Sequence, residues 1–533
     1  MSNRIDLSTG ISRRQFLTEV TAASLCSLGA ARPAGAVESH EAAALPRQQV
    51  AGTDLAALTA VDAVDALAHG DLEAEAYAHA LLRQCEAGAS LNAFITLRPE
   101  LVLEAAHECD RKRRSGARLG SLHGLPVAIK DSVNTHDLPT TAGTPALRHF
   151  QPREDAPLVR ALRHHGAIVL GKNNLHELSY GWTSNNYTFG AVHNPYDPAR
   201  IPGGSSGGTA ACIAYRMAPL GVAEDTEGSI RVPAALCGIA GFRPTTGRYP
   251  TTAVVPITAR FDQLGPHARA VADLLLFDAV LTGGPAEAST PSLKGVRLGV
   301  IRPFFWTHLD PEVERIGAAT LDRLRRAGVE LVEGELPELP RLIELTTDPV
   351  QNHDFRPAMT RYLANYHTGV TFDQLVAQAS PDIRRMVEPA ITPGRRGFVP
   401  DSQYEQIVKV HLPALHALYR DYFARSGVAA IIFPATILPA PPIKGSARDE
   451  DMYVEVRGRR VLFDEAISRN IAPGSTAGLP GLVLPAGLTH DGLPVAIELD
   501  GPWGADRDLL TLGLALEAEL GRLPPPPGAT GRA

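Results

Sequence analysis

A chain of 533 residues is long enough for one large enzyme domain or for two or three smaller ones, so length alone leaves the domain count open. Hydrophobic residues make up 44% and charged residues 20%, as in a globular protein with a sizeable core, which excludes extensive disorder outside the termini. The net charge of −7 is too small on such a surface to attract nucleic acid or an anionic membrane, so we expect a small, neutral substrate.

The first 36 residues have the features of an export signal. Residues 12–17 (SRRQFL) resemble the twin-arginine motif, a mildly apolar segment follows at 20–31, and small residues at 34–36 stand where a signal peptidase cuts. A disordered basic tail is the alternative. The apolar segment is well short of the ~20 residues that span a bilayer. We therefore expect a signal peptide over 1–36 and a periplasmic or secreted protein.

Cysteine is scarce and scattered. None of the five cysteines lies in a Cys-x-x-Cys pair or a Cys/His cluster, so neither a zinc site nor a disulfide framework is expected. Cys26 does not indicate a lipoprotein, because Leu25 precedes it where a small residue is needed.

Helix and strand patterns alternate after a polar linker at 37–52. Apolar residues at three- and four-residue spacing predict two packed helices over 54–70 and 71–87. The apolar run at 124–131, bounded by turn residues, predicts a buried strand with Lys130 at its end. Further along, the pattern predicts helices over 156–165, 212–217 and 229–236, strands over 166–170, 220–223, 295–301 and 428–433, and a helix around Ala515.

Residues 311–424 differ in sequence pattern from the parts on either side. They are mostly helical in pattern with charged faces, whereas the flanking parts contain predicted strands. We interpret them as a helical insertion that supplies walls of a substrate pocket, with a separate domain as the alternative. The proline-rich tail at 523–533 is expected to fray.

Three partial motifs each lack a feature that the corresponding site requires. The loop 203–207 fits the G-x-S-x-G nucleophile elbow, but the preceding residues 193–198 (HNPYDP) cannot form the central strand that this elbow needs. Residues 166–173 approach a phosphate-binding loop, but Asn173 replaces the Ser or Thr that holds magnesium. Residues 176–177 (HE) lack the second histidine of a zinc-protease helix.

Three segments, in this order, resemble the amidase signature family: Lys130 at a strand end, the loop 202–209 (PGGSSGGT) with Ser205, and 225–231 (DTEGSIR) with Ser229. The resemblance continues through 233–238, 241–245, 473–475 and 478–481, and it covers the chain from about Leu58 to Gly521. It implies an α/β fold in a single large domain over 53–522, with a mixed, twisted β-sheet surrounded by helices.

The resemblance also implies a catalytic triad without metal or organic cofactor. Ser229 corresponds to the nucleophile, Ser205 to a serine on a cis peptide that relays a proton, and Lys130 to the base. The backbone N–H groups of the turn that ends in Ser229 correspond to an oxyanion hole: Thr226, Glu227, Gly228 and Ser229. Because lysine accepts a proton only when it is neutral, we expect Lys130 to be buried away from carboxylates.

The motif departs from the family at two places. Glu227 stands where members usually carry glycine, and Ala223-Glu224 stand where they usually carry Gly-Thr. Glu227 is expected to narrow the oxyanion site, to select a cationic or polar substrate, or to raise the pKa of Lys130. Taken singly, Lys130 has the alternative of an ion pair with Asp131, and Ser229 that of a helix cap. The joint motif favours catalysis over both.

Residues 174–184 (NLHELSYGWTS) are similar to the matching stretch of indoleacetamide and mandelamide hydrolases in this family. We therefore expect an arylacetamide-type substrate bound by Tyr180, Trp182, Gly204 and Ser206, although the aromatic residues suit a plain core equally well. The expected partner is a small-molecule amide, without nucleic acid and without a membrane once the leader is removed, and a homodimer is left open. An ester or carbamate hydrolase on the same triad and a non-catalytic binding homologue are the alternatives.

Overall fold

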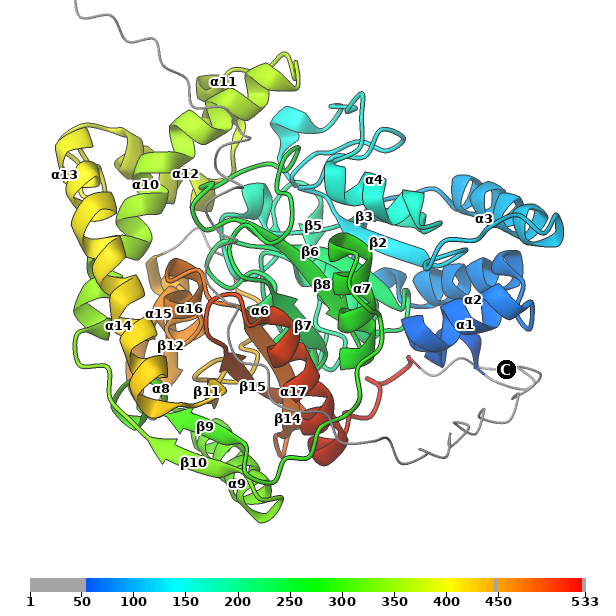
Figure 1. The fold of residues 1–533 in the computed structure, drawn as a ribbon. Coiled ribbons are helices and arrows are strands. Elements are labelled where there is room, and N and C mark those ends of the chain that lie inside the picture. The colour runs from blue at the N-terminus through cyan, green and yellow to red at the C-terminus, as the bar shows by residue number, and fades with distance from the viewer. Residues whose placement is uncertain (1–53, 445–448, 530–533) are drawn as a thin grey trace, which may run out of the picture. The chain divides into compact units, whose positions relative to one another are not determined.

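An 11-stranded β-sheet forms the centre of the fold (Figure 1). The computed structural model describes residues 54–444 and 449–529, so the predicted signal peptide at 1–36 and linker at 37–52 lie outside the described residues. The strand order is β1-β3-β2-β6-β8-β7-β14-β15-β11-β9-β10. These strands are β1 (Phe94–Leu97), β2 (Pro126–Lys130), β3 (Ile168–Asn173), β6 (Leu220–Asp225), β7 (Ala240–Arg243), β8 (Gln263–Ala268), β9 (Arg297–Val300), β10 (Glu330–Glu333), β11 (Ala430–Pro434), β14 (Gly481–Leu488) and β15 (Pro494–Asp500).

The sheet is mixed. Strands β2, β3 and β6 run parallel to one another, as do β9, β10 and β11, whereas the pairs from β6 through β8, β7, β14 and β15 to β11 are antiparallel. Two hairpin-like pairs stand apart from it, β4 (Asn185–Asn186) with β5 (Gly190–Ala191) and β12 (Tyr453–Val456) with β13 (Arg459–Leu462). The predicted fold class, a large mixed sheet with helices around it, is confirmed.

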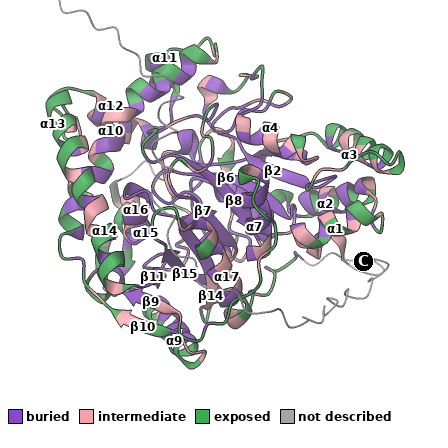
Figure 2. Cartoon of the chain, in the orientation of Figure 1, coloured by how far each residue is buried: buried purple, intermediate pink, exposed green. Residues whose placement is uncertain are grey.

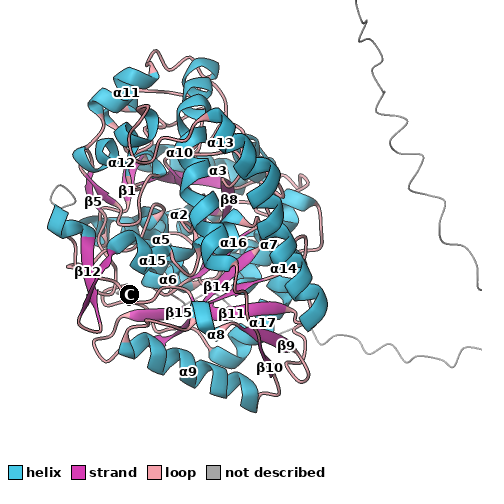
Figure 3. Cartoon of the chain, turned by 90° about the vertical axis from the view of Figure 1, so that its left-hand side faces the viewer, coloured by secondary structure: helices cyan, strands magenta, loops and turns pink. Residues whose placement is uncertain are grey.

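Helices cover the sheet, and the strands between them are largely buried, whereas α3, α11 and α13 carry many exposed residues (Figures 2 and 3). Helices α6, α9 and α17 pack on β14, and α9 also contacts α17. The helices are α1 (Ala60–His69), α2 (Ala74–Ala87), α3 (Pro99–Arg114), α4 (Pro157–His164), α5 (Gly207–Ala214), α6 (Arg231–Cys237), α7 (Val271–Thr282), α8 (Arg302–Phe305), α9 (Pro311–Arg326), α10 (Leu339–Asn365), α11 (Phe372–Gln378), α12 (Pro381–Ile391), α13 (Asp401–Gln406), α14 (Leu412–Ser426), α15 (Phe463–Ser468), α16 (Ala472–Thr476) and α17 (Asp506–Leu520).

Most predicted elements are confirmed near their predicted bounds, but α5 begins five residues before the predicted helix at 212–217. It starts inside the glycine- and serine-rich loop, because the glycines there allow close packing. A Cβ atom on Gly207 would lie 2.3 Å from the Ser184 hydroxyl, and one on Gly208 would lie 2.2 Å from the Asn174 carbonyl oxygen. Tertiary packing thus overrides the low helix propensity of glycine.

Strands β14 and β15 are missing from the sequence prediction. Both contain or begin with proline, which is usually excluded from central strands. In the structure, Pro485 sits at a register shift between Pro485 and Gly487, where the ladder to β15 is interrupted. Residues 311–424 hold α9 to α14, and their one strand, β10, is the edge of the central sheet rather than part of a separate one. None of the described helices is both long and apolar enough to cross a membrane.

Candidate active site

Lys130 and Ser205 meet at the ends of neighbouring strands. Lys130 is the last residue of β2, which pairs in parallel with β6, so the carboxyl ends of both strands lie at one edge of the sheet. Ser205 lies in the loop that leads into α5, and its hydroxyl oxygen is 2.7 Å from Lys130 Nζ. Both side chains are fully buried, and the Gly204–Ser205 peptide bond is cis, as the resemblance implies. The structure therefore brings together two of the three predicted catalytic residues directly.

Ser229 lies next to this pair, in the turn between β6 and α6. The N–H group of Ser206 donates a hydrogen bond to the Ser229 carbonyl oxygen over 3.3 Å. Gly203 packs against α6 so closely that a Cβ atom there would lie 2.8 Å from Pro233 Cα. The Ser229 side chain is buried, with 6% of its surface exposed. The loop that holds Ser205 and the turn that holds Ser229 are thus joined by backbone contacts on both sides of Ser205.

Asp225, the last residue of β6, fixes the shape of the Ser229 turn. Its carboxylate accepts hydrogen bonds from the N–H groups of Gly228 (2.9 Å) and Ile230 (3.0 Å). Gly228 has a φ of 135°, a conformation that favours glycine. Among the described residues, no protein acceptor receives the N–H groups of Glu227 or Ser229. The Thr226 N–H likewise has no acceptor within the described part of the chain, so three of the four predicted oxyanion donors are available, whereas the N–H of Gly228 is engaged with Asp225.

Two buried arginines hold Asp225 in its ionised form. Arg231 Nε lies 3.1 Å from one carboxylate oxygen of Asp225 and Arg243 Nη1 lies 3.1 Å from the other. Burial by itself raises the pKa of Asp225, but Arg231 and Arg243 outweigh it and hold the pKa well below its usual range. Arg231 also pairs with Glu498 and donates to Ser475, so it links β6, α16 and β15.

An Arg231→Met variant is expected to lose about 3–5 kcal/mol of unfolding free energy, because Asp225 and Glu498 would remain buried without their cation. Chemical denaturation followed by circular dichroism measures this loss. Arg325→Met serves as a control, since Arg325 pairs with Asp322 on the exposed face of α9 and its loss should leave the midpoint in place. Equal midpoints for Arg231→Met and the unmodified protein would contradict the structural role given to Arg231.

The expectation that Lys130 lies away from carboxylates is wrong. Lys130 Nζ is 2.7 Å from Glu224 Oε2 and 3.2 Å from the Glu224 carbonyl oxygen, and the Glu224 side chain is 2% exposed. Asp131, the partner considered from the sequence, pairs instead with Lys172 at 3.1 Å. Burial lowers the pKa of Lys130, and the Glu224 carboxylate opposes that shift. Glu224 faces Lys130 because β6 continues to Asp225, two residues beyond the predicted strand at 220–223.

Glu227 points away from that contact and into an acidic neighbourhood. Its Oε2 atom accepts a hydrogen bond of 2.6 Å from the Gln351 amide, and its side chain is buried. Burial raises the pKa of Glu227 well above its usual range, and the carboxylates of Asp348 and Asp464 add to the shift. Of the two departures in the motif, Glu224 is the one that contacts the lysine.

Trp182 lines a pocket beside the loop that holds Ser205, together with His176, Thr183, Phe463 and Asp464. The backbone of Trp182 touches Gly204, where a Cβ atom would lie 2.7 Å from the Trp182 carbonyl carbon. The pocket wall therefore contacts the residue before Ser205 through its backbone, whereas Ser205 itself does not line the pocket.

Two other predicted substrate-binding residues, Tyr180 and Ser206, have surroundings that differ from those of Trp182. Tyr180 packs against Phe355 with ring centroids 5.1 Å apart. Burial raises the pKa of the Tyr180 phenol, and the carboxylates of Asp348 and Glu227 contribute to the shift. The Ser206 hydroxyl donates to the Glu224 carbonyl oxygen over 3.0 Å and is fully buried, so it ties the loop to β6.

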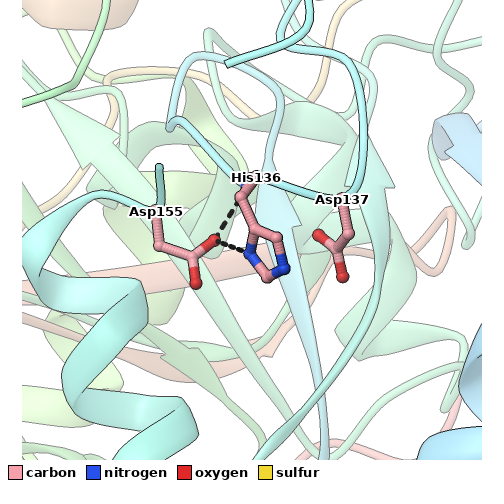
Figure 4. Close-up of side chains that lie close together, drawn as sticks. All are labelled: His136, Asp137 and Asp155. Carbon is pink, nitrogen blue, oxygen red and sulfur yellow. Dashed lines mark hydrogen bonds and ion pairs between the residues drawn. The ribbon is translucent and has the colours of Figure 1, made fainter. Parts of the chain in front are cut away.

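His136, Asp137 and Asp155 form the group of potential metal ligands found among the described residues (Figure 4). His136 Nδ1 lies 3.0 Å from Asp155 Oδ1. Arg163 already neutralises both carboxylates, with Nη2 2.6 Å from Asp137 and Nε 3.1 Å from Asp155. We assign the group to an ion-pair network that joins α4 to the loop after β2.

Comparison with known proteins agrees with this geometry. The model of the amidase family matches residues 76–510, so the chain belongs to the amidase family, and it is an amide-hydrolysing enzyme. The indoleacetamide hydrolase of Agrobacterium vitis is 39% identical over 438 residues, which cover 82% of this chain and 91% of that protein. The mandelamide hydrolase of Pseudomonas putida is 35% identical over 483 residues, covering 88% and 92%. A crystal structure of an amidase superposes with a TM-score of 0.77 at 29% identity, covering 87% of this chain and 100% of that one.

Proposed function

We propose that the protein hydrolyses a carboxamide of the arylacetamide type to a carboxylate and ammonia or an amine, with Ser229 as nucleophile, Ser205 as proton relay and Lys130 as base. The observation that carries this proposal is the 2.7 Å contact between Lys130 Nζ and Ser205 Oγ, both fully buried and next to the Ser229 turn. A serine becomes a strong nucleophile only when a neighbouring base takes its proton, and this arrangement offers one.

In the proposed reaction, Ser229 Oγ attacks the amide carbonyl carbon while its proton passes to Ser205 and the proton of Ser205 passes to Lys130. The N–H groups of Glu227 and Ser229 stabilise the oxyanion that forms. The proton then returns through Ser205 to the leaving nitrogen, the C–N bond breaks, and an acyl-enzyme ester remains on Ser229. Water attacks that ester by the same proton route and releases the acid.

The aromatic preference rests on the pocket beside Gly204. Trp182 and Phe463 give this pocket two aromatic walls next to the catalytic loop. The names of the two relatives, which describe hydrolases of indoleacetamide and mandelamide, support an aromatic acyl group. We also propose that the chain is exported by the twin-arginine route, on the strength of residues 12–17 and the small residues at 34–36.

A Trp182→Ala variant is expected to lower kcat/KM for an arylacetamide by about tenfold relative to an aliphatic primary amide, because an aromatic ring would lose its stacking surface. Ammonia release from matched amides measures the ratio. Trp503→Ala is the control, since Trp503 is 59% exposed on the surface. An unchanged ratio in Trp182→Ala would rule out this pocket as the acyl site, and faster turnover of the matched ester than of the amide would favour an esterase.

A further inference from the structure

A chain of buried polar groups continues behind Lys130, away from Ser205. Glu224 Oε2 contacts Lys130 Nζ at 2.7 Å, and Glu224 Oε1 lies 2.9 Å from the Thr226 hydroxyl oxygen. The same Thr226 oxygen lies 2.7 Å from Asp262 Oδ1. All four side chains are buried, with exposed fractions of 0% for Lys130, 2% for Glu224 and Thr226, and 5% for Asp262. The five groups from Ser205 to Asp262 are thus joined by hydrogen-bond distances.

The number of protons in this chain follows from the chemistry of Thr226. A threonine hydroxyl has one proton to donate, so it can donate to Glu224 or to Asp262 but not to both. Both contacts are of hydrogen-bond length, and two ionised carboxylates accept only. A proton on one of the two carboxyl groups satisfies both contacts, because that group then donates to Thr226.

Asp262 is the better holder of that proton. Burial raises the pKa of Asp262 to about 7, with a further contribution from the Glu224 carboxylate. The backbone N–H groups of Ile257 at 3.0 Å and Thr258 at 3.1 Å hold the Asp262 carboxyl in place and lower its pKa, but burial outweighs them. Glu224 uses its other carboxylate oxygen, Oε2, to accept from Lys130 Nζ at 2.7 Å.

The charges of the groups around these hydrogen-bonded side chains nearly cancel. Asp225 is neutralised by Arg231 and Arg243, and the positive charge of Arg243 also acts on Glu224 and Asp262. His267, on β8, faces Lys130, but burial lowers the pKa of His267 to about 4, so it is uncharged near neutral pH. Among the five hydrogen-bonded groups from Ser205 to Asp262, the remaining charges are those of Lys130 and one carboxylate.

We propose that Glu224 takes the proton of Lys130 by direct transfer, so that the neutral lysine needed as a base forms inside the protein, and that Asp262, through Thr226, holds the second proton of the group. This inference rests on the proposed function, in which Lys130 is the base. Glu224 does not reach the substrate in this scheme. It is a positioning residue that acts through Lys130.

The proton moves within the Lys130–Glu224 pair. A Lys130 N–H bond breaks and a Glu224 Oε2–H bond forms, which converts an ammonium–carboxylate pair into an amine–carboxylic acid pair without change of net charge. The neutral amine then accepts the Ser205 proton while the negative charge develops on the substrate oxyanion. Thr226 donates to Glu224 and accepts from Asp262 before and after the transfer, so its contacts need no rearrangement.

This arrangement predicts how the rate depends on pH. With Glu224 present, the lysine and its partner exchange a proton internally and release none to solvent, so kcat/KM should change less than about threefold across the mildly acidic range below the Asp262 pKa. Without Glu224, Lys130 must lose its proton to solvent. The rate should then rise by about tenfold for each pH unit until the lowered pKa of Lys130 is passed.

The test measures pH profiles of kcat/KM for a primary amide with the unmodified protein, Glu224→Thr and Glu224→Gln. If Glu224→Thr does not fold, Glu224→Gln still provides the test, because glutamine keeps the shape of the glutamate side chain. We expect a flat profile for the unmodified protein and a steep one for both variants. Asp278→Asn is the matched control, because it removes another buried carboxylate, which lies in α7 and is bound by Arg248 and Tyr249 rather than by Lys130, and should keep the flat profile. A steep profile for the unmodified protein, or flat profiles for both Glu224 variants, would overturn the proposal.

Infrared spectroscopy gives a readout that needs no turnover. The difference spectrum between the unmodified protein and Asp262→Asn at about pH 6 should contain the carbonyl stretch of one protonated carboxylic acid, since this pH lies below the Asp262 pKa. Absence of that band would overturn the proton assignment. Failure of the proposed function is recognised separately, because amide hydrolysis that survives Ser229→Ala would refute the triad and leave the infrared result standing.

Discussion

A Ser229→Ala variant is expected to lose ammonia release by about 10⁴-fold or more, because no acyl-enzyme can form without the hydroxyl. The turn around Ser229 is held by Asp225 through the N–H groups of Gly228 and Ile230, and neither contact involves the Ser229 side chain. The variant should therefore fold as before and still bind amides. Steady-state kinetics on a primary aromatic amide, with the thermal midpoint measured in parallel, checks both statements.

Ser426→Ala is the matched control for this experiment. The Ser426 hydroxyl donates to the Tyr422 carbonyl oxygen within α14, far along the chain from the catalytic loop. We expect full activity from this variant. If Ser229→Ala kept more than a few per cent of the activity, the nucleophile would have to be another residue.

Lys130→Met is expected to lower kcat/KM by about 10³-fold, since it removes the base while keeping an unbranched side chain in the buried site. Lys130→Met leaves Glu224 buried without its cation, so the thermal midpoint is measured in parallel to show that the variant is folded. The measurement is kcat/KM for a primary amide across the acidic and neutral range. The loss should persist at every pH, because no group in the variant can supply the missing amine.

Lys172→Met separates catalysis from the general effect of a buried lysine. Lys172 is also fully buried, and it pairs with Asp131 and donates to Thr140 at 2.8 Å rather than to a serine of the site. This variant should be less stable yet keep its activity at low temperature. Comparable losses of activity in Lys130→Met and Lys172→Met would contradict the role of Lys130 as base.

Much of the frame around the site is predictable from local sequence. The apolar run before Lys130 forms the buried strand β2, and the run at 220–223 forms most of β6, because a short apolar run bounded by turn residues is a local signal of a buried strand. The meeting of Lys130 with Ser205 was implied by the family resemblance rather than by periodicity, and the pairing of β2 with β6 was not predicted.

Other features depend on contacts between distant segments and escape such a prediction. The Glu224 contact with Lys130 joins residues 94 positions apart, and it depends on two extra residues at the end of β6. Asp262 enters the site from the loop before β8, a strand whose sequence contains proline and no clear alternation. The signal that was available is the departure at Ala223-Glu224, which marked the position without showing its partner.

Covalent labelling tests the central claim most directly. The protein is treated with a fluorophosphonate, digested, and analysed by mass spectrometry, with Ser229→Ala and Ser205→Ala in parallel. We predict one adduct, on the peptide that contains Ser229, which is absent in Ser229→Ala and strongly slowed in Ser205→Ala because the relay to Lys130 is broken. An adduct on Ser205 or elsewhere, or amide hydrolysis by a protein that takes up no label, would contradict the proposed Ser229–Ser205–Lys130 mechanism.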